Sequence, residues 1–272
     1  MLKIGFIGFG EVSQNIYDAL KDYDNIKLST TFDKRSHKTI NMIKNSGINV
    51  FNNIKELTQD SDILISAVTP NNALTVAIEI SPYLKGIYMD INTISPITIQ
   101  KILKYIPKNK YVDTALIGRI TDNDSYFIVS GENTKEILNL NNYGLRIKKF
   151  GDNPSQASQL KILRSNYTKG VSALLYETFK TAYNLGIHEE LLEILKETEG
   201  KVFTKKINSR ICNSYNYSKR RNEELKEINL FLEKNSSEEM IMNNAICEFF
   251  TKLNKKHELD KDFDSYQELF KH

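Results

Sequence analysis

Cysteine and histidine are scarce in this chain of 272 residues. Its two cysteines, Cys212 and Cys247, cannot form a disulfide framework, lack the spacing of metal ligands, and suit a reducing compartment. The four histidines are scattered, and no two of them have the helical spacing of a metal site. The sequence therefore supports neither a metal centre nor a Ser-His-Asp arrangement.

Long apolar runs and an excess of one charge are also missing. No stretch approaches the roughly 20 apolar residues that a membrane span needs. Glu11, Gln14 and Asp18 interrupt the apolar run that a signal peptide would require, so we expect a cytoplasmic protein that does not engage a membrane. The 37 basic residues nearly balance the 34 acidic ones, and this argues against a dedicated nucleic-acid binder.

What the first half does contain is an alternation of apolar runs and amphipathic stretches, which predict strands and helices respectively. Strands separated by helices of this length predict an α/β fold with a parallel, doubly wound sheet. The expected strands cover residues 3–7, 26–32, 48–51, 62–67, 87–90, 111–115, 126–130 and 145–150. The expected helices cover residues 11–21, a stretch ending near 43, 54–57, 73–84 and a segment that Ser95 and Pro96 begin.

The texture of the sequence changes after Gly151. From Ser155 onward there is no proline and no convincing strand, and helical periodicity dominates residues 157–185, 189–199, 203–234 and 238–256. We therefore predict a Rossmann-type domain over residues 1–152, followed by an all-α domain over residues 153–272.

A glycine-rich segment, Gly8-x-Gly10-x-x-Ser13, lies between the first expected strand and the first expected helix. It resembles the G-x-G-x-x-G turn of dinucleotide-binding proteins, with serine at the third glycine. Gly8 permits the tight turn, and Gly10 lets the backbone approach a pyrophosphate at the positive end of the helix. A plain buried strand–turn–helix is the alternative. The backbone amides expected to face the pyrophosphate are those of Phe9, Gly10, Glu11 and Val12.

The residues after the second expected strand bear on the choice of cofactor. Asp33 could accept hydrogen bonds from the ribose diol of NAD. Lys34, Arg35 and Ser36 follow at once, and two cations and a hydroxyl suit the 2′-phosphate of NADP. We favour NADP over NAD, although a solvated loop would also explain these residues.

Several segments, in order, resemble the β-hydroxyacid dehydrogenase and 6-phosphogluconate dehydrogenase superfamily. They are GFIGFGEVSQNI (5–16), SAVTP (66–70), MDINTISP (89–96), YVDTALIG (111–118) and SQASQLKILRS (155–165). The segment ILRSNYTKGVSALLYET (162–178) resembles the branch with a distinct helical C-terminal domain, found in archaeal proteins of unassigned substrate. The resemblance covers most of the chain and implies a nicotinamide-dependent oxidoreductase.

The resemblance also implies roles for particular residues. It assigns contact with the nicotinamide half of the cofactor to Val68, Thr69 and Pro70. Two substrate segments of the family correspond to residues 90–96 and 113–119, and they depart from its pattern. Asn92 and Ile117 stand where the family has serine, and Arg119 adds a cation. The implied substrate-binding residues are Asn92, Thr93, Gly118, Arg119 and Lys161.

The catalytic lysine of the family corresponds to Lys161, and Ser165 replaces an asparagine one helical turn later. A lysine can accept the hydroxyl proton during oxidation and return it during reduction, provided that its pKa is lowered toward neutrality. Arg164 and Lys169 on the same stretch could lower it. We therefore predict Lys161 as the general acid/base, with Ser165 and Asn92 as further catalytic residues.

These observations together predict an NADP-dependent oxidoreductase acting on a small hydroxy or keto acid, in a homodimer expected by analogy. A non-catalytic NADP-binding sensor or scaffold, motivated by Ser165 and Ile117, is the first alternative. An imine or carbonyl reductase on the same fold is the second. The run Lys219-Arg220-Arg221, followed by several glutamates, is interpreted as a solvated or ion-paired helix face in preference to a clamp for a substrate anion.

Overall fold

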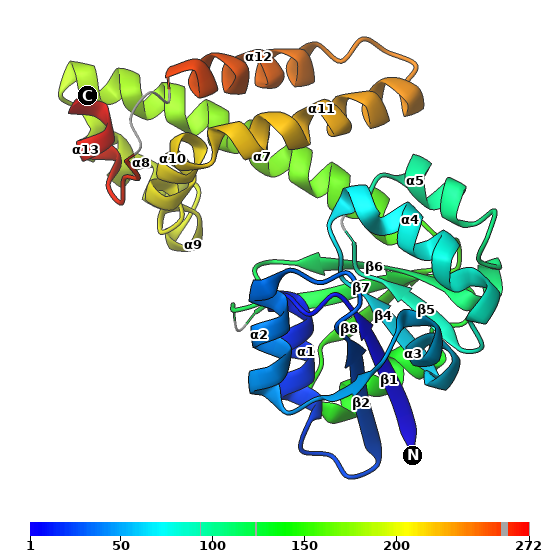
Figure 1. Cartoon of the computed structure of the whole chain (residues 1–272). Coiled ribbons are helices and arrows are strands. Elements are labelled where there is room, and N and C mark those ends of the chain that lie inside the picture. The colour runs from blue at the N-terminus through cyan, green and yellow to red at the C-terminus, as the bar shows by residue number, and fades with distance from the viewer. Residues whose placement is uncertain (93, 123, 257–260, 272) are drawn as a thin grey trace. The chain divides into compact units, whose positions relative to one another are not determined.

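The computed structural model describes residues 1–92, 94–122, 124–256 and 261–271 (Figure 1). Thr93, one of the predicted substrate ligands, lies outside them. The chain forms two compact units, Met1–Lys161 and Ile162–His272. The division falls inside one long helix, whereas the change in composition placed it at 152/153. No helix in the described ranges is long and apolar enough to cross a membrane.

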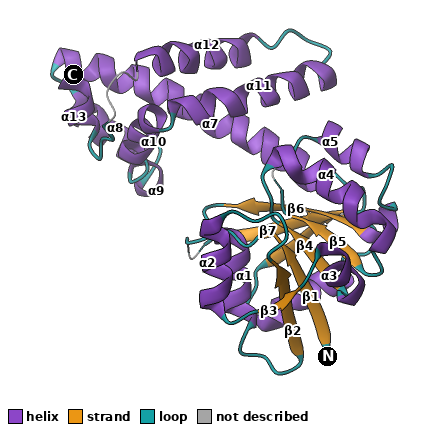
Figure 2. Ribbon diagram, in the orientation of Figure 1, coloured by secondary structure: helices purple, strands orange, loops and turns teal. Residues whose placement is uncertain are grey.

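The first unit is built around an eight-stranded sheet with the order β3-β2-β1-β4-β5-β6-β7-β8 (Figure 2). This is the predicted Rossmann-type topology, in which β2 and β3 extend the sheet to one side of β1, and β4 and the later strands extend it to the other. The strands are β1 (Leu2–Ile7), β2 (Ile26–Thr31), β3 (Asn49–Phe51), β4 (Ile63–Ser66), β5 (Ile87–Asp90), β6 (Tyr111–Ile117), β7 (Tyr126–Ser130) and β8 (Ile147–Gly151).

The sheet is parallel, as predicted, except between β6 and β7, which pair antiparallel. Parallel neighbours need a crossover of about a dozen residues or more. The connecting segment 118–125 is too short for one, and it returns the chain as a hairpin. The remaining pairs, including β7 with β8, are parallel.

Helices cover both faces of the sheet, and each face has its own apolar core. Ile16 and Leu20 of α1, Ile43 of α2 and Ile137 of α6 pack on one face. Helices α3, α4 and α5 pack on the other, through side chains such as Ala77 of α4. These helices are α1 (Glu11–Leu20), α2 (His37–Ser46), α3 (Ile54–Asp60), α4 (Pro70–Ile80), α5 (Pro96–Ile102) and α6 (Lys135–Asn139), with 3-10 turns η1 (Ser81–Tyr83), η2 (Lys108–Lys110) and η3 (Leu140–Tyr143).

The second unit is built of helices around an aromatic core that includes Phe179, Phe250 and Phe263. The helical periodicity expected over residues 203–234 is divided among three helices, with the last break at Tyr217, whose backbone leaves the helical region. The helices are α7 (Gln156–Leu185, which begins in the first unit), α8 (His188–Thr198), α9 (Lys201–Thr204), α10 (Ile207–Asn216), α11 (Ser218–Asn235), α12 (Ile241–Lys256) and α13 (Tyr266–Lys271).

Helix α13 was not predicted from the sequence. Its buried side chains Tyr266, Leu269 and Phe270 have helical spacing, but the segment is too short for that pattern to stand out. The Asn208 side chain on α10 holds its start, since Oδ1 accepts a hydrogen bond from Tyr266 N at 2.9 Å. Tertiary contacts therefore stabilise a helix that would be marginal alone.

Candidate nucleotide-binding and catalytic site

The turn after β1 requires glycine at its first position. Gly8 has φ of +89°, and a Cβ built there would lie 2.3 Å from the Ala67 carbonyl oxygen. Ser13, at the place of the third glycine, is fully buried, and its Oγ donates to the Gly8 carbonyl oxygen at 2.8 Å. Serine is thus small enough for the close packing of α1 on the sheet, and its hydroxyl ties the helix to the turn.

Neither backbone conformation nor packing within the protein requires glycine at the second position, Gly10. Gly10 has an ordinary φ of −86°, and among the described residues no atom lies within 4 Å of a Cβ built there. The first amides of a helix have no acceptor within the helix. No described side chain caps the start of α1 either. Open space beside free amides at a positive helix end fits a pyrophosphate.

The residues after β2 differ in whether their side chains already have a partner within the protein. Lys34 Nζ is paired with Glu79 Oε1 at 2.7 Å, and Ser36 Oγ caps α2 by accepting from Thr39 N at 3.3 Å. Arg35 is half-buried, and its Nε is buried without a partner among the described residues. Burial lowers the pKa of its guanidinium. An unsatisfied buried donor on a cation fits a phosphate group, so Arg35 suits a 2′-phosphate better than its neighbours do.

A row of buried polar side chains crosses the sheet at the carboxyl ends of β4 and β5. The register aligns Ser66 with Asp90, Asp90 with Asp113, and Asp113 with Ser130. All four are almost completely buried. This row was not predicted, because it depends on how the strands pair; buried runs ending in serine or aspartate are the only trace of it in the sequence.

Burial raises the pKa of Asp90 to about 7, although hydrogen bonds from Asn92 N and Tyr111 Oη act in the opposite direction. The Asn92 side chain contacts this part of the row and the loop after β4. Its Oδ1 accepts from Val68 N at 2.6 Å, and its Nδ2 donates to Ser66 Oγ at 2.9 Å. Asn92 therefore fixes the loop that carries Val68, next to Thr69 and Pro70 at the start of α4.

The far side of the row anchors the start of α7. Asp113 accepts hydrogen bonds from Ser158 Oγ at 2.6 Å and Ser158 N at 2.8 Å, and Ser130 Oγ accepts from Ala157 N at 3.0 Å. Burial raises the pKa of Asp113, while these bonds and the charge of Lys161 lower it. Lys161 follows Ser158 by three positions, so the predicted catalytic amine is placed beside the buried row by a capped helix.

The remaining predicted residues lie elsewhere. Gly118 and Arg119 begin the β6–β7 connection, where Gly118 has φ of +92° and Arg119 is exposed. Ser165 belongs to the second unit, and its Oγ accepts a hydrogen bond from Lys169 Nζ. The first unit therefore contains the glycine turn, Arg35, Asn92 and Lys161; the predicted roles of all these residues remain predictions.

Comparisons with known proteins agree with this architecture. The family described as NADP oxidoreductase, coenzyme F420-dependent, matches residues 3–90, and a domain of unknown function, DUF1932, matches residues 182–253. An uncharacterised 28.5 kDa protein of Methanothermus fervidus is 46% identical over 85% of this chain and 91% of its own length.

Two solved structures extend the comparison. The conserved protein MTH1747, of unknown function but with structural similarity to 3-hydroxyacid dehydrogenases, is 38% identical and superposes with a TM-score of 0.82 over 93% of this chain and 97% of its own. The 3-hydroxyisobutyrate dehydrogenase of Mycobacterium tuberculosis, with L-serine, is 14% identical and shares the fold, with a TM-score of 0.80 over the whole of both chains.

The fold and the glycine turn thus define a protein of the Rossmann-fold class, whose first part matches an NADP oxidoreductase family. Within that class, the chain belongs to the β-hydroxyacid dehydrogenase-like superfamily, in the branch with a distinct helical C-terminal domain, together with the M. fervidus protein and MTH1747.

Proposed function

We propose that this protein transfers hydride between NADP and a small hydroxy or keto acid, with Lys161 as general acid/base. The observation that carries the proposal is the pairing of two features in one unit. One is a glycine turn whose second glycine faces open space. The other is a lysine held beside the buried row through Ser158 and Asp113.

The chain would contribute binding and proton transfer to this reaction. Bound NADP would supply the hydride acceptor or donor. The amides after Gly8 would hold the pyrophosphate, and Arg35 the 2′-phosphate. The neutral amine of Lys161 would accept the hydroxyl proton during oxidation, and its ammonium form would return a proton to the carbonyl oxygen during reduction.

The test is a titration of the purified chain with NADPH and NADH by calorimetry, followed by an assay of cofactor consumption with a panel of keto acids and imines. We expect NADPH to bind, and a keto acid to be reduced. Binding without turnover on either class would support the sensor alternative, which Ser165 favours because its hydroxyl is held by Lys169. Turnover of imines alone would support the imine reductase.

Replacing Arg35 with serine tests the cofactor preference. Loss of one charge-assisted contact should weaken NADPH binding roughly tenfold to a hundredfold and leave NADH binding unchanged. Lys38→Ser is the matched control, because Lys38 is an exposed cation on the neighbouring first turn of α2. Equal loss for both cofactors would show that Arg35 serves the fold and not the 2′-phosphate.

We also propose a homodimer formed through the helical unit. Leu163, Tyr167 and Leu174 of α7 are spaced to share one helix face, and they are 48%, 65% and 66% exposed. Several exposed apolar side chains on one helix face are typical of subunit interfaces. Analytical ultracentrifugation at micromolar concentration should give twice the mass of the chain; a monomer at that concentration would contradict the proposal.

A further inference from the structure

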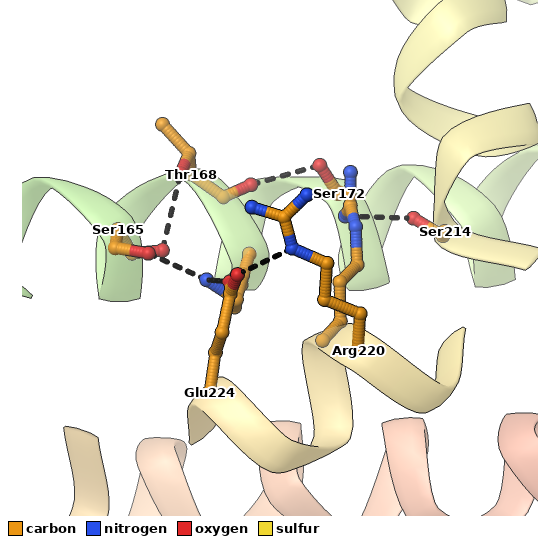
Figure 3. Close-up of polar contacts among 8 residues, drawn as sticks. Ser165, Thr168, Ser172, Ser214, Arg220 and Glu224 are labelled. Atoms are coloured by element: carbon orange, nitrogen blue, oxygen red, sulfur yellow. Dashed lines mark hydrogen bonds and ion pairs between the residues drawn. The ribbon is translucent and has the colours of Figure 1, made fainter. Parts of the chain in front are cut away.

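The helical unit contains a cluster of charged side chains that the proposed reaction does not use (Figure 3). Lys169 of α7 is only 5% exposed, and its Nζ pairs with Glu224 Oε2 of α11 at 2.8 Å. Arg220, one turn before Glu224, pairs with the other carboxylate oxygen at 2.9 Å. Figure 3 shows Glu224 and Arg220 rising from α11 toward Ser165 on α7.

A third cation of the cluster is not paired with a carboxylate. Arg221 Nη1 donates to Ser214 Oγ at 3.2 Å, and its guanidinium lies 5.6 Å from the centre of the Phe250 ring. It makes no ion pair with any residue that the structure describes. Burial, together with the positive charges of Arg210 and Arg220, lowers the pKa of Arg221 to about 10, although the charge of Glu224 acts in the opposite direction.

Two unsatisfied donors lie at the same α10–α11 junction. Arg210 Nη1 is buried without a partner in the described parts of the chain, and so is Oγ of Ser218, a residue that is 1% exposed. Ser218 begins α11, one turn before Arg221. Ser214 lies between the two arginines, because its Oγ donates to the main-chain carbonyl oxygen of Arg210 and accepts from Arg221. The charge of Arg210 also acts on Arg221.

The charges of this cluster do not balance. Lys169, Arg210, Arg220 and Arg221 carry four positive charges, and Glu224 supplies one negative charge. Buried cations without counter-ions are costly, and native proteins pair them. Arg220 is exposed to solvent, but the partly buried Arg210 and Arg221 would be stabilised by additional negative charge from a ligand. The expectation of a solvated or ion-paired face therefore fits Arg220 but not Arg221.

We propose that the α10–α11 junction binds an oxyanion, a phosphate or carboxylate group, through Arg221, Arg210 and the Ser218 hydroxyl. A guanidinium presents paired N–H donors that match two oxygens of such a group, and the hydroxyl supplies a further donor. Glu224 is neutralised by Lys169 and Arg220, so it does not repel the anion. Every residue of this site belongs to the second unit.

The test is a calorimetric titration of the full chain with inorganic phosphate in a low-salt chloride buffer. Wild type should bind one phosphate per chain. Arg221→Met should weaken binding by roughly tenfold or more, while the control Lys219→Met, which removes an exposed cation two positions before Arg221, should change it by less than about twofold. No binding at roughly 10 mM phosphate, or equal binding by wild type and Arg221→Met, would overturn the proposal.

A second variant and a second assay keep the result decisive. Should Arg221→Met lose its helical circular dichroism, Arg210→Gln replaces it, with weaker binding again expected. In any assay that shows turnover, competition between phosphate and the acid substrate identifies the oxyanion as the substrate's own group; phosphate binding without competition identifies a separate ligand. The calorimetry needs no turnover, so it remains valid if the proposed dehydrogenase activity is absent.

Discussion

Lys161→Met is expected to reduce turnover by about 10²- to 10⁴-fold and to leave NADPH binding unchanged. General acid/base groups contribute rate factors of this size, and methionine keeps the length of the side chain while removing the amine. The glycine turn that is proposed to bind the cofactor is separate from α7, so the affinity for NADPH should not fall together with turnover. Steady-state kinetics and calorimetry on the same preparation measure the two effects.

The control for this substitution is Lys135→Met, which removes an exposed lysine from α6. It should retain full activity. Lys161→Met also removes a positive charge near Asp113, and that charge lowers the pKa of the carboxyl. A modest change in stability is therefore compatible with the proposal, whereas full turnover by Lys161→Met is not.

Alanine substitutions at Gly8 and Gly10 should affect different properties, stability in the first case and NADPH binding in the second. Gly8→Ala places a Cβ 2.3 Å from the Ala67 carbonyl oxygen at φ of +89°, so we expect a loss of more than about 2 kcal/mol in the free energy of unfolding. Gly10→Ala meets no described atom within 4 Å. It should leave the unfolding free energy nearly unchanged but weaken NADPH binding, because its methyl group occupies the space assigned to the pyrophosphate.

Urea denaturation and NADPH titration of both variants check this pair. We expect Gly8→Ala to lower stability and Gly10→Ala to lower NADPH affinity at nearly unchanged stability. This result would show that the fold requires Gly8 and that the ligand requires Gly10. If Gly10→Ala binds NADPH as wild type does, the open space beside the turn has another purpose, and the proposed function loses its main support.

Much of the first unit could be predicted from the sequence, because most of its strands are short runs rich in apolar residues and several of its turns contain glycine. The eight strands lie within two residues of the expected ranges. The hairpin between β6 and β7 was missed, although the short connection after Ile117 was visible in the sequence. Two neighbouring strands joined by only a few residues pair antiparallel, whereas strands joined by a helix can pair parallel.

The polar row and the cation cluster could not have been predicted in the same way. Asp113 caps α7 through Ser158, 45 positions later, and such a contact depends on strand register and helix placement together. Arg220 and Arg221 are adjacent in the sequence, yet successive residues on a helix point in directions about 100° apart. One reaches Glu224 at the surface, and the other lies against Phe250 in the core.

The bond from Ser13 to the Gly8 carbonyl oxygen has a consequence for how a nucleotide would associate. A loop tied internally is already ordered when it is empty, so little conformational entropy is lost on complex formation. Association should therefore follow a single step without a slow rearrangement of residues 8–13. The dinucleotide would meet a preorganised surface, much as a rigid inhibitor meets its enzyme.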